Sequence, residues 1–263
     1  MMLYLICCAV TCFACILGTI CGMGGGIIIK PALDAAGLMP VETITFLSGC
    51  TVISMSCWSV GKTLWKRESV LDLKNTPLLA VAAALGGLLG KQLYTLAAGL
   101  FAQRDTAGGV QACLLFAATL ATLVYTLRKD RLRSKQIGSL TAGFCIGLFL
   151  GMLGAFLGIG GGPFNVAALT YFFSMPTKKA TQNSLLIVLL SQGASTLKTV
   201  LFDGIPAFDP GLLAGMILLG IVGSELGRRI NRRLNERQAT RCLEGCMVLI
   251  LCINMYNIVK YLC

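Results

Sequence analysis

The chain has 263 residues and a formal net charge of +11, and 56% of its residues are hydrophobic whereas 13% are charged. Soluble domains carry about a quarter of charged residues, so this composition, with a mean hydropathy of +0.80, excludes an ordinary soluble protein and indicates a polytopic membrane protein. The basic residues form short runs between apolar segments, without an aromatic-interleaved patch, which argues against nucleic acid as a partner. We expect these residues to orient the chain in the lipid bilayer.

The apolar segments predict an all-α fold with about eight long membrane helices. Each segment is near the ~20 residues that a helix needs to cross a bilayer. The first has no basic region or cleavage site before a polar mature domain, so we interpret it as a retained helix rather than a signal peptide. The expected helices span about residues 2–21, 43–65, 76–100, 108–127, 137–157, 180–202, 210–227 and 242–262.

Two glycine runs interrupt this pattern, Gly-Met-Gly-Gly-Gly at residues 22–26 and Gly-Ile-Gly-Gly-Gly at residues 158–162. Glycine costs about 1 kcal/mol relative to alanine in a helix interior and adopts positive φ readily. The apolar pieces that follow, residues 27–38 and 163–173, are too short to cross a bilayer and predict two half-helices. Because exposed backbone has no partner in lipid, both breaks should face protein or water.

The second half of the chain repeats the first at an offset of 136 residues, from Gly22 to Gly158. Ser59 and Lys62 match Ser195 and Lys198 at this offset. After one inserted residue, Gly86-x-x-x-Gly90 matches Gly223-x-x-x-Gly227, and we interpret these glycines as helix-packing positions. We therefore divide the chain into a first repeat (1–127), a basic cytoplasmic linker (128–136) and a second repeat (137–263).

The distribution of basic residues favours two repeats of inverted topology. If all eight long segments simply crossed, the basic residues would divide almost evenly between the two sides, against the positive-inside rule. If each glycine break turns the chain back, the second repeat inverts and the long basic loops share one face, which we expect to be cytoplasmic. The expected location is the cell membrane (inner or plasma membrane), with both termini on its outer side. That face would hold Lys66, Arg67, Lys74, Arg128, Lys129, Arg131, Arg133, Lys135, Lys178, Lys179, Arg228, Arg229, Arg232, Arg233, Arg237 and Arg241.

A glycine run before a half-helix predicts an anion site, because the first N–H groups of a helix are unpaired and carry the positive end of its dipole. Inverted-repeat transporters place such helix ends near the membrane midplane. The alternative is that the glycines only allow close packing of helices. The expected substrate-binding residues at the breaks are Gly24, Gly25, Gly26, Ile27, Gly160, Gly161, Gly162 and Phe164.

Three lysines could add positive charge to this site. Lys30 lies four residues after the first break, and Lys62 and Lys198 are repeat equivalents. A cation at membrane depth usually marks a transport pathway, whereas the alternative for each lysine is a place at the membrane interface. Glu225 is a candidate for proton coupling, with a local ion pair to Arg228 as the alternative.

Further polar residues follow each half-helix, among them Ser48, Ser184, Ser191 and Gln192. They either bond neighbouring helices or line a pathway.

The sequence offers no support for an enzyme. It contains no His, which removes the usual imidazole base and metal ligand, and its glycine runs lack the Lys-Ser/Thr of a phosphate loop. Cys12 and Cys15 have a redox or metal spacing, but no second pair accompanies them, and packing between helices is the simpler interpretation. We expect no catalytic residue, no metal and no cofactor.

The glycine elements resemble those of the TauE/SafE sulfite exporter family, also called TSUP. The resemblance lies in Gly-Met-Gly-Gly-Gly-Ile-Ile-Ile-Lys-Pro-Ala-Leu at residues 22–33 and Gly-Ile-Gly-Gly-Gly-Pro-Phe-Asn-Val-Ala-Ala-Leu at residues 158–169, and it covers nearly the whole chain. The two copies differ, since Pro163 directly follows its glycines whereas Pro31 lies five residues after them.

The resemblance implies a secondary transporter that exports a small sulfur-containing anion, such as sulfite, sulfoacetate or another organosulfonate, coupled to the proton gradient. A passive anion channel and a membrane assembly subunit without transport remain open as alternatives. The expected partners are the small anion and the lipid bilayer, and the sequence is also compatible with a homodimer.

Overall fold

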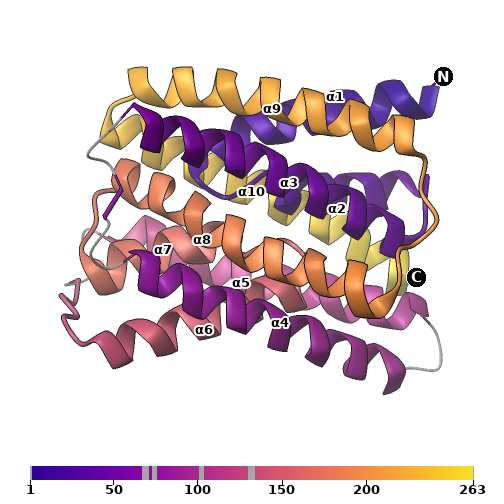
Figure 1. The fold of residues 1–263 in the computed structure, drawn as a ribbon, viewed down its shortest axis with the longest axis horizontal. Coiled ribbons are helices and arrows are strands. Elements are labelled where there is room, and N and C mark those ends of the chain that lie inside the picture. The colour runs from indigo at the N-terminus through magenta and orange to yellow at the C-terminus, as the bar shows by residue number, and fades with distance from the viewer. Residues whose placement is uncertain (1, 67–70, 73–75, 101–103, 130–133, 263) are drawn as a thin grey trace.

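The computed structural model describes residues 1–263 except 1, 67–70, 73–75, 101–103, 130–133 and 263 (Figure 1). The described residues form ten α-helices and no β-strand, which confirms the all-α prediction of about eight long helices and two half-helices. Seven helices are long and apolar enough to cross a membrane. The helices are α1 (Met2–Cys21), α2 (Gly26–Ala36), α3 (Val41–Trp65), α4 (Thr76–Leu100), α5 (Arg104–Arg128), α6 (Leu140–Phe156), α7 (Gly162–Phe173), α8 (Thr177–Lys198, followed by the π-helical turn Thr199–Asp203), α9 (Pro210–Arg233) and α10 (Glu236–Leu262).

Several helix boundaries differ from the prediction, and those of α6 and α9 differ for identifiable reasons. Helix α6 begins at Leu140 rather than at residue 137, because the hydroxyl of Ser139 caps it by accepting from the N–H of Ala142 and the residues before it bond to the end of α7. Helix α9 runs to Arg233 rather than to residue 227, because its last turns are charged and hydropathy cannot follow a helix beyond its apolar segment.

The first glycine break reverses the chain, so α1 and α2 form a hairpin. Tyr4 near the start of α1 donates to the carboxylate of Asp209, and Thr43 at the start of α3 donates to the carbonyl of Ala207 at 3.1 Å. Because α3 directly follows α2, the start of α1 and the end of α2 lie at the same end of the molecule. This end also holds both chain termini, at the right of Figure 1, and we call it the termini end.

The second break reverses the chain in the same way but at the opposite end. Ser174 after α7 donates to Ser134 before α6 at 2.8 Å, and Lys129 at the end of α5 donates to Thr177 at 3.0 Å and to Thr240 at 2.8 Å. The start of α6 and the end of α7 therefore lie with the starts of α8 and α10, at the left of Figure 1. The second repeat is inverted relative to the first, as predicted.

The end that carries the second hairpin gathers the described loops that the sequence analysis assigned to one face, and we call it the basic end. Lys66 ends α3 there, and Lys178 donates to the carbonyl of Leu234 at 2.7 Å across the loops before α8 and α10. Arg67, Lys74, Arg131 and Arg133 lie outside the described residues. The basic charge that the sequence predicted to share one face thus lies at one end wherever the structure describes it.

The small-xxx-small glycines are packing positions, as predicted, and they make equivalent contacts in the two repeats. A Cβ built on Gly223 of α9 would lie 2.7 Å from the carbonyl oxygen of Cys12 in α1, and one on Gly86 of α4 would collide with the carbonyl oxygen of Leu148 in α6. Cys12 and Leu148 are themselves 136 residues apart. Cys15 also packs against Gly223, since its Cβ lies 3.1 Å from the position of a Cβ built on that glycine. This contact accords with a packing role for Cys15.

Candidate anion site at the two glycine breaks

The two breaks meet inside the protein. We call residues 22–27 the first tip and residues 158–164 the second tip. A Cβ built on Gly26 would lie 3.6 Å from the carbonyl oxygen of Ile159, and one built on Gly162 would lie 2.7 Å from Cδ1 of Ile27. All residues of both tips are buried. The structure therefore brings together eight of the predicted site residues: Gly24, Gly25, Gly26, Ile27, Gly160, Gly161, Gly162 and Phe164.

Positive backbone φ values explain why glycine occupies the tips. Gly22 and Gly24 have φ of 68° and 67°, and their equivalents Gly158 and Gly160 have 69° and 76°. Residues with a Cβ rarely adopt this region. In addition, a Cβ on Gly24 would lie 3.3 Å from Val52 and 3.1 Å from Val188, so a larger residue would also meet the flanking helices α3 and α8.

The tips present several backbone N–H groups, although two of the predicted donors are already engaged. The first hydrogen bonds of α2 run from Ile28 and Ile29 to the carbonyl of Gly25, so the N–H groups of Gly26 and Ile27 precede them. The N–H of Gly25 points to the sulfur of Met55 at 3.2 Å, which is a weak acceptor. The N–H of Gly160 closes the end of α6 by bonding to Gly154 at 3.2 Å.

Helices α3 and α8 pack against the tips through equivalent residues. Gly22 packs against Thr181 of α8, and Gly158 packs against Thr45 of α3, with a built Cβ 3.5 Å from its methyl carbon. Thr45 and Thr181 are 136 residues apart. The two tips therefore make equivalent contacts with α8 and α3, as the internal repeat implies.

Lys30 connects the first hairpin to the second. Its ammonium group donates to Oε1 of Gln111 at 2.7 Å and to the carbonyl of Leu157 at 3.2 Å, and Nε2 of Gln111 donates to the carbonyl of Phe156 at 2.7 Å. Lys30 is 6% exposed, so its side chain is enclosed by protein rather than extended into the surroundings. It places positive charge at the carbonyl end of α6, where the helix dipole is negative.

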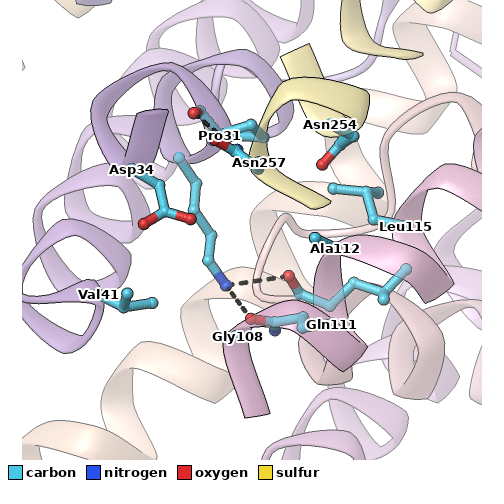
Figure 2. A pocket seen from close by; sticks show the side chains of 11 residues that line it. Pro31, Asp34, Val41, Gly108, Gln111, Ala112, Leu115, Asn254 and Asn257 are labelled. Atoms are coloured by element: carbon cyan, nitrogen blue, oxygen red, sulfur yellow. Dashed lines mark hydrogen bonds between the residues drawn. The ribbon is translucent and has the colours of Figure 1, made fainter. Parts of the chain in front are cut away.

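A small cavity lies beside this lysine, between α2, α5 and α10 (Figure 2). Its volume is about 20 Å³, which is enough for one water molecule. Asp34 lines it one turn after Lys30, and Asn254 and Asn257 line it from α10. Polar side chains therefore line this cavity beyond Lys30, on the side toward the termini end, which is the direction in which α2 runs.

The structure does not bring Lys62 and Lys198 to the tips. Lys62 and Lys198 each lie ten residues after the valine that contacts Gly24, Val52 and Val188 respectively, so a helix carries them about 15 Å away. Lys62 lies at the basic end of α3, and Lys198 lies at the termini end of α8. The two lysines contact different partners. Lys198 donates to Oε1 of Gln92 at 3.1 Å, whereas Lys62 pairs with Glu225.

Glu225 accepts from a group of donors rather than from Arg228 alone. Its Oε2 lies 2.8 Å from the ammonium of Lys62 and accepts from Nε1 of Trp58 at 3.2 Å. Nε of Arg229 donates to Oε1 at 3.0 Å, and Nε of Arg228 lies 3.6 Å from Oε2. These contacts join α3 of the first repeat to α9 of the second near the basic end.

The sequence analysis missed Asn165, which is the fourth residue of α7 and 1% exposed. The available signal was a polar residue in an apolar half-helix, at the position where the first repeat has Ile29.

Two inverted repeats whose glycine-broken half-helices meet at the centre of a helical bundle are an architecture typical of membrane transporters. The family model described as "Sulfite exporter TauE/SafE" matches residues 7–255, and the chain belongs to this family, as its glycine elements indicated. No curated protein and no solved structure matched the chain. Membership in a transporter family also accords with the expectation that the chain is not an enzyme.

Proposed function

We propose that this transporter exports a small sulfur-containing anion, of the sulfite, sulfoacetate or organosulfonate class, from the cell and couples this export to the proton gradient. The observation that carries the proposal is the meeting of the two tips. The N-terminal ends of α2 and α7 approach each other there, so two positive dipole ends and their first N–H groups converge on one buried region.

The charge around this region also suits a singly or doubly charged anion that must be released again. Lys30 brings a cation to the second tip, with its ammonium beside Gly158, and this ammonium is already held by Gln111 and a carbonyl group. Neutral donors with one nearby, partly compensated cation bind an anion less tightly than a direct ion pair would. Moderate binding favours turnover.

Burial of the tips supports a carrier over the alternative of a passive anion channel. The residues on both sides of the breaks are buried, from 18 to 31 and from 157 to 166. A channel needs a continuous water-filled path past its selectivity site, whereas a carrier passes through states in which that site is closed. In this conformation the tips are enclosed by α3 and α8.

Uptake into proteoliposomes tests the proposal. We expect the purified protein to transport sulfite or an organosulfonate in saturable fashion, faster with a pH gradient than without one, and to show no steady conductance in planar bilayers. Gly25→Leu and Gly161→Leu should abolish uptake, whereas Gly61→Leu, whose Cβ would meet nothing within 4 Å, should retain it. Normal uptake in both tip variants would refute the site, and no transport of any of these anions by the wild type would refute the function.

A further inference from the structure

The second tip carries a buried amide without partners. Asn165 is 1% exposed, and within the described part of the chain neither its Nδ2 nor its Oδ1 has a hydrogen-bond partner. The amide lies over Gly161, the residue that precedes α7, because a Cβ built there would lie 2.6 Å from Nδ2 and 2.8 Å from Oδ1. Buried polar side chains are nearly always hydrogen-bonded, so an amide left unpaired at a helix N-terminus needs an explanation.

A second amide lies over the neighbouring glycine. Gln192 of α8 is 5% exposed, and its Oε1 is also unpaired among the described residues. This oxygen lies 3.2 Å from the position of a Cβ on Gly160. Ser184, Val188 and Gln192 follow one another at intervals of four and therefore share one face of α8. Val188 contacts both Gly24 and Gly160, so this is the face that meets the tips.

The first tip has no equivalent of these two amides. Ile29 occupies the position of Asn165, and Ser56 occupies the position of Gln192. Met55, the equivalent of Ser191, offers a thioether to the N–H of Gly25. Two tips with the same backbone shape thus differ in chemistry, because the second can donate and accept hydrogen bonds through side chains and the first offers mainly backbone N–H groups.

We propose that Asn165 and Gln192 form the selective half of the anion site and favour a singly charged oxyanion that carries an O–H group, such as hydrogen sulfite. This inference rests on the proposed function and narrows its substrate class. Nδ2 of Asn165 and the N-terminus of α7 donate to the charged oxygens of the anion. The amide oxygens accept from its O–H group, whereas they repel an anion whose oxygens are all deprotonated.

The amides thereby select by hydrogen bonding rather than by charge. A site built around a hydrogen bond to a substrate O–H rejects an analogue without that group strongly, because the analogue leaves the acceptor buried and unpaired. Methanesulfonate has the same single charge as hydrogen sulfite but no O–H group. Sulfate has two charges and no proton at neutral pH.

Binding to the purified full chain in detergent tests the proposal by isothermal titration calorimetry. Sulfite is titrated at about pH 6, where hydrogen sulfite predominates, and methanesulfonate and sulfate are titrated in the same buffer. We expect the wild type to bind hydrogen sulfite about 10- to 100-fold more tightly than methanesulfonate, as a hydrogen bond to a charged group implies. Asn165→Leu and Gln192→Met should lose most of this preference.

Two controls separate selectivity from folding. Ser56→Ala, at the first-repeat equivalent of Gln192, should keep the preference of the wild type. Asn165→Leu should unfold at the same or a higher temperature than the wild type, since it replaces unpaired buried groups with an apolar side chain of similar size.

Each contrary result has its own meaning. Equal binding of methanesulfonate and hydrogen sulfite by the wild type, or an unchanged preference in both amide variants, would overturn this inference and leave the proposed function standing. If the wild type neither bound nor transported any sulfur-containing anion, the proposed function would fail and this inference with it.

Discussion

The ammonium nitrogen of Lys30 lies 2.6 Å from the position that a Cβ on Gly158 would occupy. The lysine follows the first break and the glycine begins the second, so a cation of one repeat fills the space of a missing side chain in the other. Gly158 also has a φ of 69°, which L-residues rarely adopt. Two independent requirements therefore select glycine at this position.

We expect Gly158→Ala to destabilise the protein by about 2 kcal/mol or more, because the left-handed backbone costs roughly 1–2 kcal/mol and the new methyl group displaces the lysine from its acceptors. The unfolding temperature in detergent measures this effect. Gly61→Ala is the matched control, since it adds a methyl group in open space within α3 and should leave stability equal or slightly higher. Equal behaviour of the two variants would contradict the contact.

The small-xxx-small glycines give a second prediction, in which equivalent positions of the two repeats respond alike. Gly86→Ala and Gly223→Ala should each separate a tightly packed helix pair, α4 from α6 and α9 from α1, because the methyl group meets a backbone carbonyl that cannot rotate away. We expect both to lower the unfolding temperature. Gly61→Ala in the first repeat and Gly245→Ala in the second, where a Cβ would meet no described atom within 4 Å, serve as controls in each half and should not lower it.

Much of the architecture follows from the sequence because it rests on local chemistry. Consecutive glycines at 24–26 and 160–162 cannot continue a stable helix, and the basic loops can share one side only if both breaks reverse the chain. Those two facts predict inverted hairpins. The packing of Gly86 and Gly223 follows similarly, because small residues one turn apart have few other uses in a membrane helix.

The partners of the polar side chains could not be predicted, because they depend on the register between helices far apart in the sequence. Lys30 bonds to Gln111 on α5, and Lys62 pairs with Glu225 on α9. No local pattern gives these pairs. Asn165 was missed for a related reason. Its significance lies in the hydrogen-bond partners that it lacks among the described residues, and a sequence does not reveal whether a side chain is paired.

Glu225 provides a third prediction, which separates an ion-pair role from proton coupling. Lys62, Arg229 and Trp58 all donate to or pair with its carboxylate, so a proton could reach it only if several contacts opened together. We expect Glu225→Gln to lower stability by about 1 kcal/mol and to leave stimulation of uptake by a pH gradient intact. Lys62→Met, which removes the same pair from the other side, should behave alike.

Loss of that stimulation in Glu225→Gln, with exchange between equal anion concentrations unaffected, would instead identify Glu225 as the coupling residue. Exchange without a gradient is the informative control here, because it reports substrate binding and conformational change without net proton movement.

The last prediction concerns the orientation of the two ends in the membrane. The basic end should face the cytoplasm and the termini end the outside, because positive loops are retained on the cytoplasmic side. Single cysteines introduced at Ser134 and Gln238 report the basic end, and cysteines at Leu38 and Ala207 report the termini end; all four positions are exposed. The background should lack the exposed natural cysteines, Cys57, Cys113, Cys145 and Cys252.

In intact cells, a membrane-impermeant maleimide should label Leu38→Cys and Ala207→Cys, and should label Ser134→Cys and Gln238→Cys only after the membrane is opened. Labelling of Ser134→Cys and Ala207→Cys from the same side would contradict the inverted hairpins, whereas a complete reversal would keep the fold and contradict only the assigned orientation.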